Sequence, residues 1–266
     1  MLCPVHGMER SAHYKNSKVF PMSDSPVLDN QPTGSNGVVW KDFPEAALLN
    51  RVTAEIVHNF PRPLQDDNRR VHTPTLFVAL GSVCGFAAQT SLFSLIKTGL
   101  RPEQDMMAHT LTGGQTFLFG EQLNQFLLQG DPTVHNFGLW PCLSGVAIQK
   151  NCSPQDFPDL NTQFASVASR LGTAEEGVPD VAPSFRPLIA TESLREAMWA
   201  YVEPIFLQDY PDKQAAYDPL PKHLWSSAMN VAAGILFSKM FNVMDVRTAM
   251  TLILQSAIFG SKIIEN

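Results

Sequence analysis

Apolar side chains recur every three or four residues through much of this 266-residue chain. Such spacing puts each set on one face of a helix, and that face needs a neighbouring element to cover it. The pattern therefore predicts a core of helices packed on helices. The clearest stripes are Leu160, Phe164, Val167 and Leu171; Leu194, Met198, Tyr201 and Ile205; and Val246, Met250, Ile253, Ala257 and Ile264.

Prolines, glycines and capping residues indicate where these helices begin and end. A first helix is expected over about 43–59, because Pro61 stops it. A central helix is expected over about 74–97, with Gly99 as its C-terminal cap. The remaining helices are expected at 121–128, within 134–149, from Ser153 or Pro158 to Gly172, from a Thr191 cap to Pro204, and over 222–240 and 245–263.

One segment, residues 109–119, has the pattern of a hairpin. A Gly113–Gly114 pair separates two short β-prone runs, which is typical of a two-residue turn between antiparallel strands. The sequence thus predicts a mainly all-α fold, a compact bundle of about eight helices with one small β-hairpin. We expect residues 42–266 to form a single α-helical domain and residues 1–41, rich in Pro, Gly, Ser and Asn, to be a flexible N-terminal arm.

Composition narrows the classes of partner and compartment. A formal net charge of -6 and a pI near 5.6 argue against a nucleic-acid or a membrane partner, since both attract positive surfaces. Scattered cysteines without a C-x-x-C pair, and an N-terminus without the apolar core of a signal peptide, favour a cytoplasmic protein. The uncharged stretch 71–96 is long enough for a membrane span, but its polar residues favour a buried central helix.

The expected helix over 222–240 carries two adjacent apolar stripes. A single contact with the core need not cover both of them, so we expect the protein to form a two-fold homodimer. The stripes are Leu224, Ala228, Val231 and Ile235, and beside them Trp225, Met229, Ala232 and Leu236.

Motifs for catalysis or cofactor binding are sparse. The seven histidines are spread out with no H-E-x-x-H pair, and there is no glycine-rich nucleotide loop, so we expect neither a metal nor a cofactor. Ser94, Lys97 and Gly99 fit the S-x-x-K and K-T-G motifs of penicillin-recognising enzymes, but one lysine cannot serve both roles. Cys84 lies in an apolar helix, which would raise the pKa of its thiol and leave it unreactive.

The strongest candidate for a functional site is the passage from the hairpin to the next helix. There Gln115, Phe119, Glu121 and Asn124, with His109 on the first strand, surround a break in regular helical packing. Such a cluster suits a binding protein for a small, partly apolar ligand or for a protein partner. The alternatives are an enzyme with a site assembled around Asn124, Glu121 and His109, and a structural role in which the amides bond to the local backbone.

The run Phe119-Gly120-Glu121-Gln122-Leu123-Asn124 resembles a landmark of an uncharacterised family of bacterial proteins, in which Phe-Gly and an acidic residue precede Leu-Asn or Ile-Asn. The chain departs from that pattern by Glu121, where Asp is expected, and by a less aromatic run before Phe119. The resemblance covers about residues 43–264 and implies an all-helical fold, with no particular activity. Its other landmarks are Phe86-Ala87-Ala88, Leu139-Trp140 with Gly145 and Ala147, Gly177-Val178-Pro179 and Ser261-Lys262.

Overall fold

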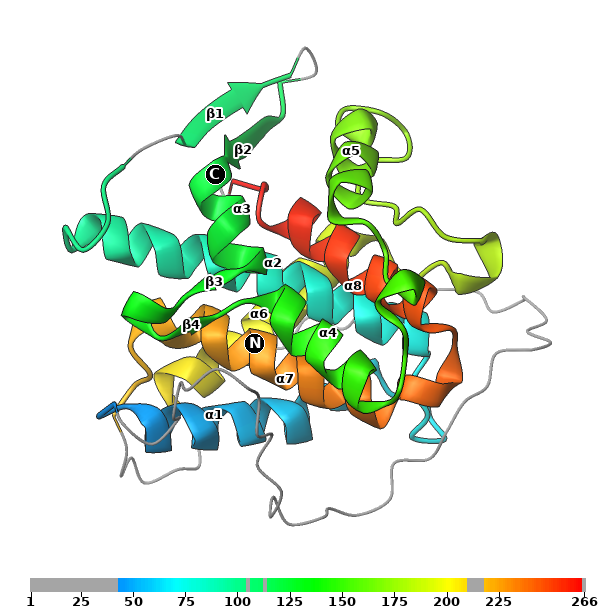
Figure 1. Cartoon of the computed structure of the whole chain (residues 1–266), viewed down its shortest axis with the longest axis horizontal. Helices are drawn as coiled ribbons and strands as arrows, with labels where there is room; N and C mark the ends of the chain where they lie inside the picture. Colours follow the sequence, from blue (N-terminus) through cyan, green and yellow to red (C-terminus); the bar gives the residue numbers. More distant parts are fainter. Residues whose placement is uncertain (1–42, 104–105, 112–113, 210–217, 265–266) are drawn as a thin grey trace.

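A computed structural model describes residues 43–103, 106–111, 114–209 and 218–264, so the expected arm at 1–41 lies outside the described residues. The structure is 64% helical, with two small antiparallel sheets (Figure 1), which confirms the predicted fold class. The helices are α1 (Ala46–Asn59), α2 (Thr73–Lys97), α3 (Glu121–Leu128), α4 (Leu139–Gln149), α5 (Leu160–Arg170), α6 (Thr191–Leu207), α7 (Trp225–Lys239) and α8 (Val246–Gly260); the strands are β1 (Met106–Thr110), β2 (Thr116–Gly120), β3 (Gly130–Asp131) and β4 (Asn136–Phe137).

Helix α2 is the centre of the fold. It packs against α8, α7, α6 and α3, and α7 is covered in turn by α1 and α4 (Figure 1). Helix α5 is different, because α8 is the only helix with which it makes an extensive contact among the described elements. The result is a layered core with α5 and the β1–β2 hairpin at its edge.

The contact between α2 and α8 is close because glycines lie on both sides of it. A Cβ added at Gly81 would lie 2.1 Å from the carbonyl oxygen of Ile253, and one at Gly85 would lie 2.0 Å from that of Ala257. Real Cβ atoms do not approach backbone atoms so closely. The two helices therefore pack in this way only if these positions have no side chain.

The environment of α2 matches the expected buried central helix. Among the described residues it is the one helix long and apolar enough to cross a membrane, and 89% of its most apolar window is buried inside the fold. Two of its buried polar side chains have partners there: Gln89 Nε2 donates to the carbonyl oxygen of Ile263, and Ser91 Oγ donates to that of Lys222. Satisfied polar groups of this kind explain why α2 can carry them in a core.

The hairpin differs from the prediction in its turn. Strands β1 and β2 pair in the register that runs from Met106 opposite Gly120 to Thr110 opposite Thr116. The predicted two-residue turn is wrong, because the Leu111 N–H still donates to the carbonyl oxygen of Gln115 at 2.8 Å. Gly114 has a φ of +87°, so it supplies the left-handed residue that a longer loop needs. The sequence did not predict the β3–β4 pair, because two residues per strand are too few to show an alternating pattern.

Both predicted ends of α6 need correction. Thr191 does not cap the helix, since its hydroxyl donates to the carbonyl oxygen of Gly177 instead. The helix also does not stop at Pro204 but continues to Leu207. Ile205 and Phe206 follow the proline and are buried in the core. Their burial offsets the backbone hydrogen bond that Pro204 cannot make.

The start of α5 combines features of the two predicted alternatives. Ser153 forms a capping box with Asp156, but the helix that it caps is a short 3₁₀ turn. Helix α5 begins later, at Leu160, where Asp159 accepts a hydrogen bond from the backbone N–H of Thr162 at 2.8 Å. The later start fits the alternative that placed it near Pro158.

Both apolar stripes of α7 are accounted for within one chain. Ala228, Met229 and Leu236 are buried in the core, where α7 packs against α2, α1 and α4. Trp225 is buried against Trp199 and Phe206 of α6, while Val231 and Ile235 of the first stripe are half-buried. The two stripes therefore have neighbours without a second subunit. The homodimer stays a prediction that light scattering can test.

Candidate ligand-binding site

The predicted site residues lie on the hairpin and on α3, where Glu121 and Asn124, three residues apart, share one face of the helix. Gln115 lies exposed beside the loop, and Glu121 lies exposed at the first turn of α3, where its carboxylate accepts from Gln125 Nε2 at 3.1 Å. Asn124 is half-buried, and its side chain has no hydrogen bond with the described residues. Phe119 is half-buried and packs against a small apolar cluster. The polar candidates do not converge on one point.

His109 and Glu121 are not brought together. His109 is on β1, opposite Phe117, and its ring meets that of Phe119 edge-on at 6.3 Å between centroids. Glu121 lies four residues beyond Phe117, the partner of His109, which is about 13 Å along an extended backbone. An acid–base pair of these two side chains would need them within hydrogen-bonding distance.

The structure adds a residue that the sequence interpretation did not include among its site candidates. The Nζ atom of Lys262 lies over the ring of Phe119, 4.7 Å from its centroid. The residue is only 4% exposed, whereas the other described lysines are exposed. Its ammonium group makes no hydrogen bond or ion pair with a described residue. A clue was present in the sequence, because Lys262 is the one charged residue between Arg247 and Glu265 in an otherwise apolar run.

Backbone hydrogen bonds fix Lys262 from both sides. Its carbonyl oxygen accepts from the N–H of Leu118 on β2 at 2.7 Å, and its own N–H donates to Phe259 at the end of α8. The next residue, Ile263, bonds to Gln89 of α2. The segment after α8 is thus hydrogen-bonded to the hairpin on one side and to the core on the other. These bonds fix the position of the Lys262 backbone.

Burial lowers the pKa of Lys262 to about 8, from an ordinary value of 10.5. Desolvation is the cause, because taking an ammonium out of water without a negative partner favours its neutral form. The C-terminal end of α8, two residues away, offers a partial negative charge. That helix end does not restore the ordinary pKa.

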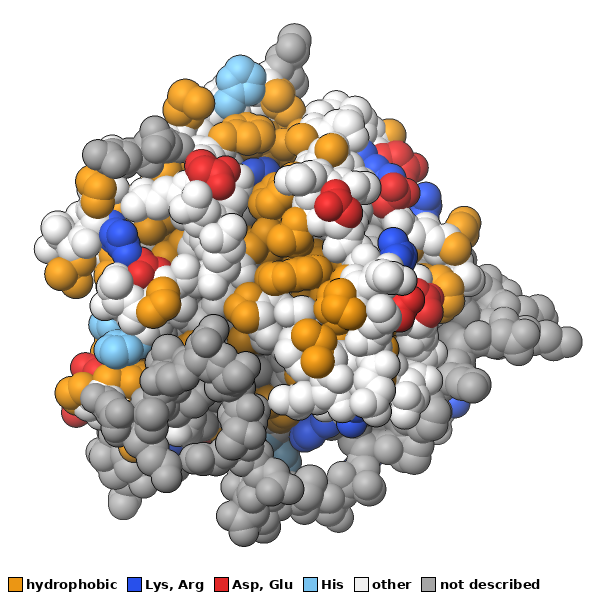
Figure 2. All heavy atoms as spheres, viewed as in Figure 1, with side chains coloured by type: hydrophobic (Ala, Val, Ile, Leu, Met, Phe, Trp, Pro, Cys, Tyr) orange, Lys and Arg blue, Asp and Glu red, His pale blue; other side chains and the backbone are white. Residues whose placement is uncertain are grey.

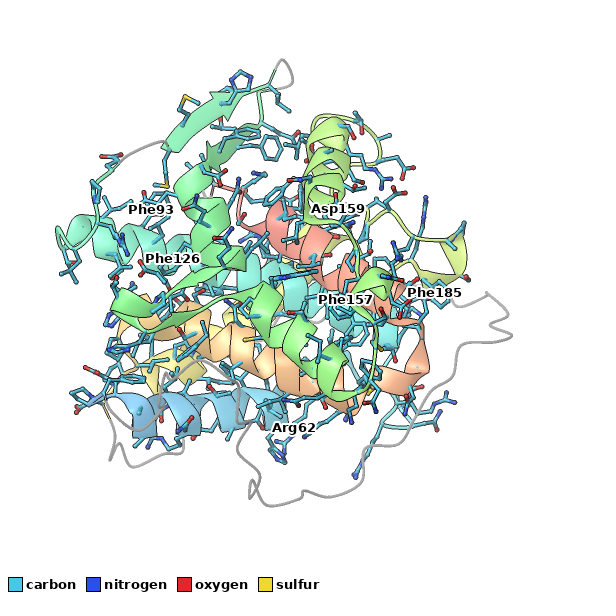
Figure 3. All side chains as sticks on the ribbon, viewed as in Figure 1. Arg62, Phe93, Phe126, Phe157, Asp159 and Phe185 are labelled. Carbon is cyan, nitrogen blue, oxygen red and sulfur yellow. The ribbon has the colours of Figure 1, made fainter. Side chains whose placement is uncertain are left out.

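An apolar band extends from the hairpin across one face of the molecule. Figure 2 shows it as a continuous strip of hydrophobic side chains between α5 on one side and α3 and α4 on the other, with basic atoms at its hairpin end. Figure 3 places Phe157 in this region, between α4 and α5. Partly buried hydrophobic side chains on the flanking elements are Phe119, Trp140, Leu160 and Phe164. We call this strip the apolar band.

Helix α5 is tied to α8 by a buried polar link. Gln255 Nε2 donates to Gln163 Oε1 at 2.9 Å, and Gln255 Oε1 accepts from the backbone N–H of Asp180. Arg170 pairs with Asp180 at 2.7 Å and also donates to the loop carbonyl of Val178. The link holds one wall of the apolar band in place.

A separate cleft lies on the other flank of α3. Its volume is about 210 Å³, and Leu92, Gln122, Gln125, Phe126 and Asp131 line it together with Gly130 and Arg101. Gln122 and Asn124 are two residues apart and so point about 200° apart around the helix, which separates this cleft from the Asn124 flank. Figure 3 agrees, with Phe126 on the side of α3 away from α5. The charges in the cleft are already paired, because Arg101 contacts Asp131.

The cysteine and metal alternatives gain no geometric support. Burial raises the pKa of the Cys84 thiol well above its ordinary value, with the nearby Cys142 as a second cause. This confirms the expected effect of the apolar helix on Cys84. Within the described ranges, no three His, Cys, Asp or Glu side chains are grouped as metal ligands would be.

Comparisons with models of protein families, with curated proteins and with solved structures find no match. The resemblance to a bacterial helical family therefore stays a prediction. The case for function rests on the arrangement of Lys262, Phe119 and the apolar band.

Proposed function

We propose that this chain is a binding protein for a small, partly apolar molecule, whose apolar part lies along the apolar band and whose polar end lies at Lys262. The observation that carries the proposal is Lys262, a residue only 4% exposed whose ammonium group has no counter-charge among the described residues. Binding sites commonly combine apolar walls with a few fixed polar groups. The apolar band, with Lys262 at one end, combines such apolar walls with one charged group.

The energetic cost of Lys262 supports a role in binding. A buried charge without a partner destabilises a fold, and a neutral side chain of similar length would avoid the cost. Strongly shifted titratable groups cluster at functional sites for this reason. In the cleft on the far side of α3, by contrast, Asp131 already neutralises Arg101.

The geometry favours binding over an enzyme assembled around Asn124, Glu121 and His109. His109 and Glu121 lie near opposite ends of the hairpin, and Glu121 is already bonded to Gln125. Of the original site residues, Phe119 contacts Lys262 and His109 contacts Phe119. These two belong to the proposed site, which we place in the cytoplasm in keeping with the acidic composition and scattered cysteines.

Titration of the protein with octanol, followed by calorimetry, tests the proposal. Octanol should bind saturably, and Phe164→Glu should weaken binding at least tenfold because it puts a charge on the apolar band. Phe164→Ala is a milder second variant if the glutamate disturbs α5. Phe93→Glu is the matched control, since Phe93 is 43% exposed on α2 and lies away from the apolar band (Figure 3). Absence of saturable binding to the wild-type protein, or equal loss in the control, would overturn the proposal.

A further inference from the structure

We infer that the polar end of the ligand is an anion, a carboxylate, which lies against the ammonium group of Lys262. This inference rests on the proposed function and specifies the ligand class for the same site. Charge complementarity carries it. The ammonium is 4.7 Å from the centroid of the Phe119 ring and has no carboxylate of the described chain within 4.0 Å.

Among the described residues, the surroundings of Lys262 offer no competing anion. Strand β2 has no charged side chain, and the only charged residue of α8 is Arg247, at its far end. On the other neighbouring elements, the titratable groups are His109 on β1, Glu121 on α3, Cys84 and Lys97 on α2, and Arg170 on α5, with Glu175 and Glu176 in the loop after α5. Glu176 accepts from the backbone N–H of Gly172, and Glu175 pairs with Arg186. Glu121 is bonded to Gln125, and Arg170 to Asp180. The ammonium is therefore available to an external acid.

The ring of Phe119 does not replace a counter-ion. A cation over an aromatic face gains only part of the stabilisation that a charge-assisted hydrogen bond provides. A carboxylate would accept such a bond from Nζ, while an attached hydrocarbon chain would cover the half-buried side chains of Phe119 and Phe164. A monocarboxylic acid with an apolar chain meets both requirements.

Anion binding at Lys262 couples to proton uptake. The free lysine has a pKa of about 8, and a bound carboxylate raises it again because the ion pair favours the charged form. At pH 8 about half of the free molecules carry the proton, so binding should take up as much as about half a proton per ligand. Above pH 8, affinity should fall by up to about tenfold per pH unit.

Paired titrations with octanoate and octanol, which have the same chain length, test this inference. At pH 7 we expect octanoate to bind about 10- to 100-fold more tightly, the usual effect of a hydrogen bond to a charged group. Lys262→Met should remove that preference and leave octanol binding intact. Lys262→Arg should keep the preference but abolish the dependence on pH between 8 and 10, because arginine stays charged. Lys150→Met, a change of an exposed lysine on the end of α4, is the control and should change nothing.

The outcomes separate this inference from the proposed function. If octanol binds as tightly as octanoate, the apolar site stands and the anionic ligand class is wrong. If neither probe binds, the proposed function itself fails. Octanal trapped on Lys262 by borohydride, without binding of octanoate, would also overturn the inference, because the lysine would then act as an amine toward a carbonyl group. Proton uptake measured in buffers of different ionisation enthalpy gives a readout that a purely structural lysine would not produce.

Discussion

The main core and the apolar cluster beside the hairpin each contain a buried cation over an aromatic ring. Arg195 of α6 lies 4.8 Å from the ring centroid of Phe86, and Lys262 lies 4.7 Å from that of Phe119. In the core, a carboxylate oxygen of Glu196 lies 3.8 Å from the guanidinium group. Beside the hairpin, Lys262 has no carboxylate partner among the described residues. The core thus neutralises its buried charge and the smaller cluster does not.

This difference shows how the two regions contribute to the molecule. Several buried polar groups around α7 are hydrogen-bonded: Ser227 Oγ donates to the carbonyl oxygen of His135, and Asn136 Nδ2 donates to that of Phe126. Such bonding stabilises the arrangement of the helices. The cluster of Phe117, Val167, Ile258, Phe259 and Ile263 is smaller, and Lys262 lies over the ring of Phe119, which packs against this cluster. We therefore attribute stability to the first region and propose ligand recognition for the second.

The largest expected effect tests whether the main core is rigid. Gly85→Ala should lower the free energy of unfolding by about 3 kcal/mol or more, because the added Cβ would meet the backbone of α8. Gly145→Ala in α4 is the matched control, since its Cβ would meet nothing within 4 Å. It should stabilise the protein by about 0.5–1 kcal/mol through helix propensity. Urea denaturation measures both; equal effects would mean that α2 and α8 are not closely packed.

The second expected effect concerns the uncompensated charge. Lys262→Met should raise the free energy of unfolding by up to about 3 kcal/mol at pH 7, since each pH unit between 10.5 and about 8 corresponds to about 1.4 kcal/mol. In the wild type, the folded lysine loses its proton before the unfolded one does. Wild-type stability should therefore rise from about pH 8 to pH 10.5 and remove the advantage of the variant. A difference in urea midpoint that is independent of pH would contradict the burial of a free ammonium.

Replacing Arg195, the cation with a carboxylate nearby, should have a smaller effect on the free energy of unfolding, and of opposite sign. Arg195→Met should lower the free energy of unfolding by about 1 kcal/mol, because it removes the contacts with Phe86 and Glu196. The loss should be the same at pH 7 and at pH 10, in contrast to the effect of Lys262→Met. If Arg195→Met stabilises the protein as Lys262→Met does, the proposed contrast between the two regions is wrong.

The smallest expected effects are at the original site residues. Glu121→Ala removes a single bond to Gln125 within α3, and Asn124→Ala removes no bond to the described residues. Each should change the free energy of unfolding by less than about 0.5 kcal/mol. Octanol titration of the same variants sharpens the map of the site. A large loss of affinity in either variant would extend the site onto α3.

The sequence alone determined the helices and many of their ends. Side-chain periodicity and caps act within a few residues, which is why α2 ends before Gly99, as predicted, and why the second strand leads directly into α3. Local rules failed where distant contacts competed with them. Pro204 remains inside α6 because Ile205 and Phe206 are buried, and Thr191 bonds to a distant loop instead of capping its helix.

The tertiary structure decided which residues form the candidate site. Phe119 and Lys262 are far apart in the sequence, and they meet because the segment after α8 bonds to β2 and, through Ile263, to α2. Sequence periodicity shows that one face of a helix is apolar, but it does not specify which element covers that face. It also does not show which charged side chain becomes desolvated. The composition of the run around Lys262 was visible in the sequence; its burial without a partner depends on the packing of three separate segments.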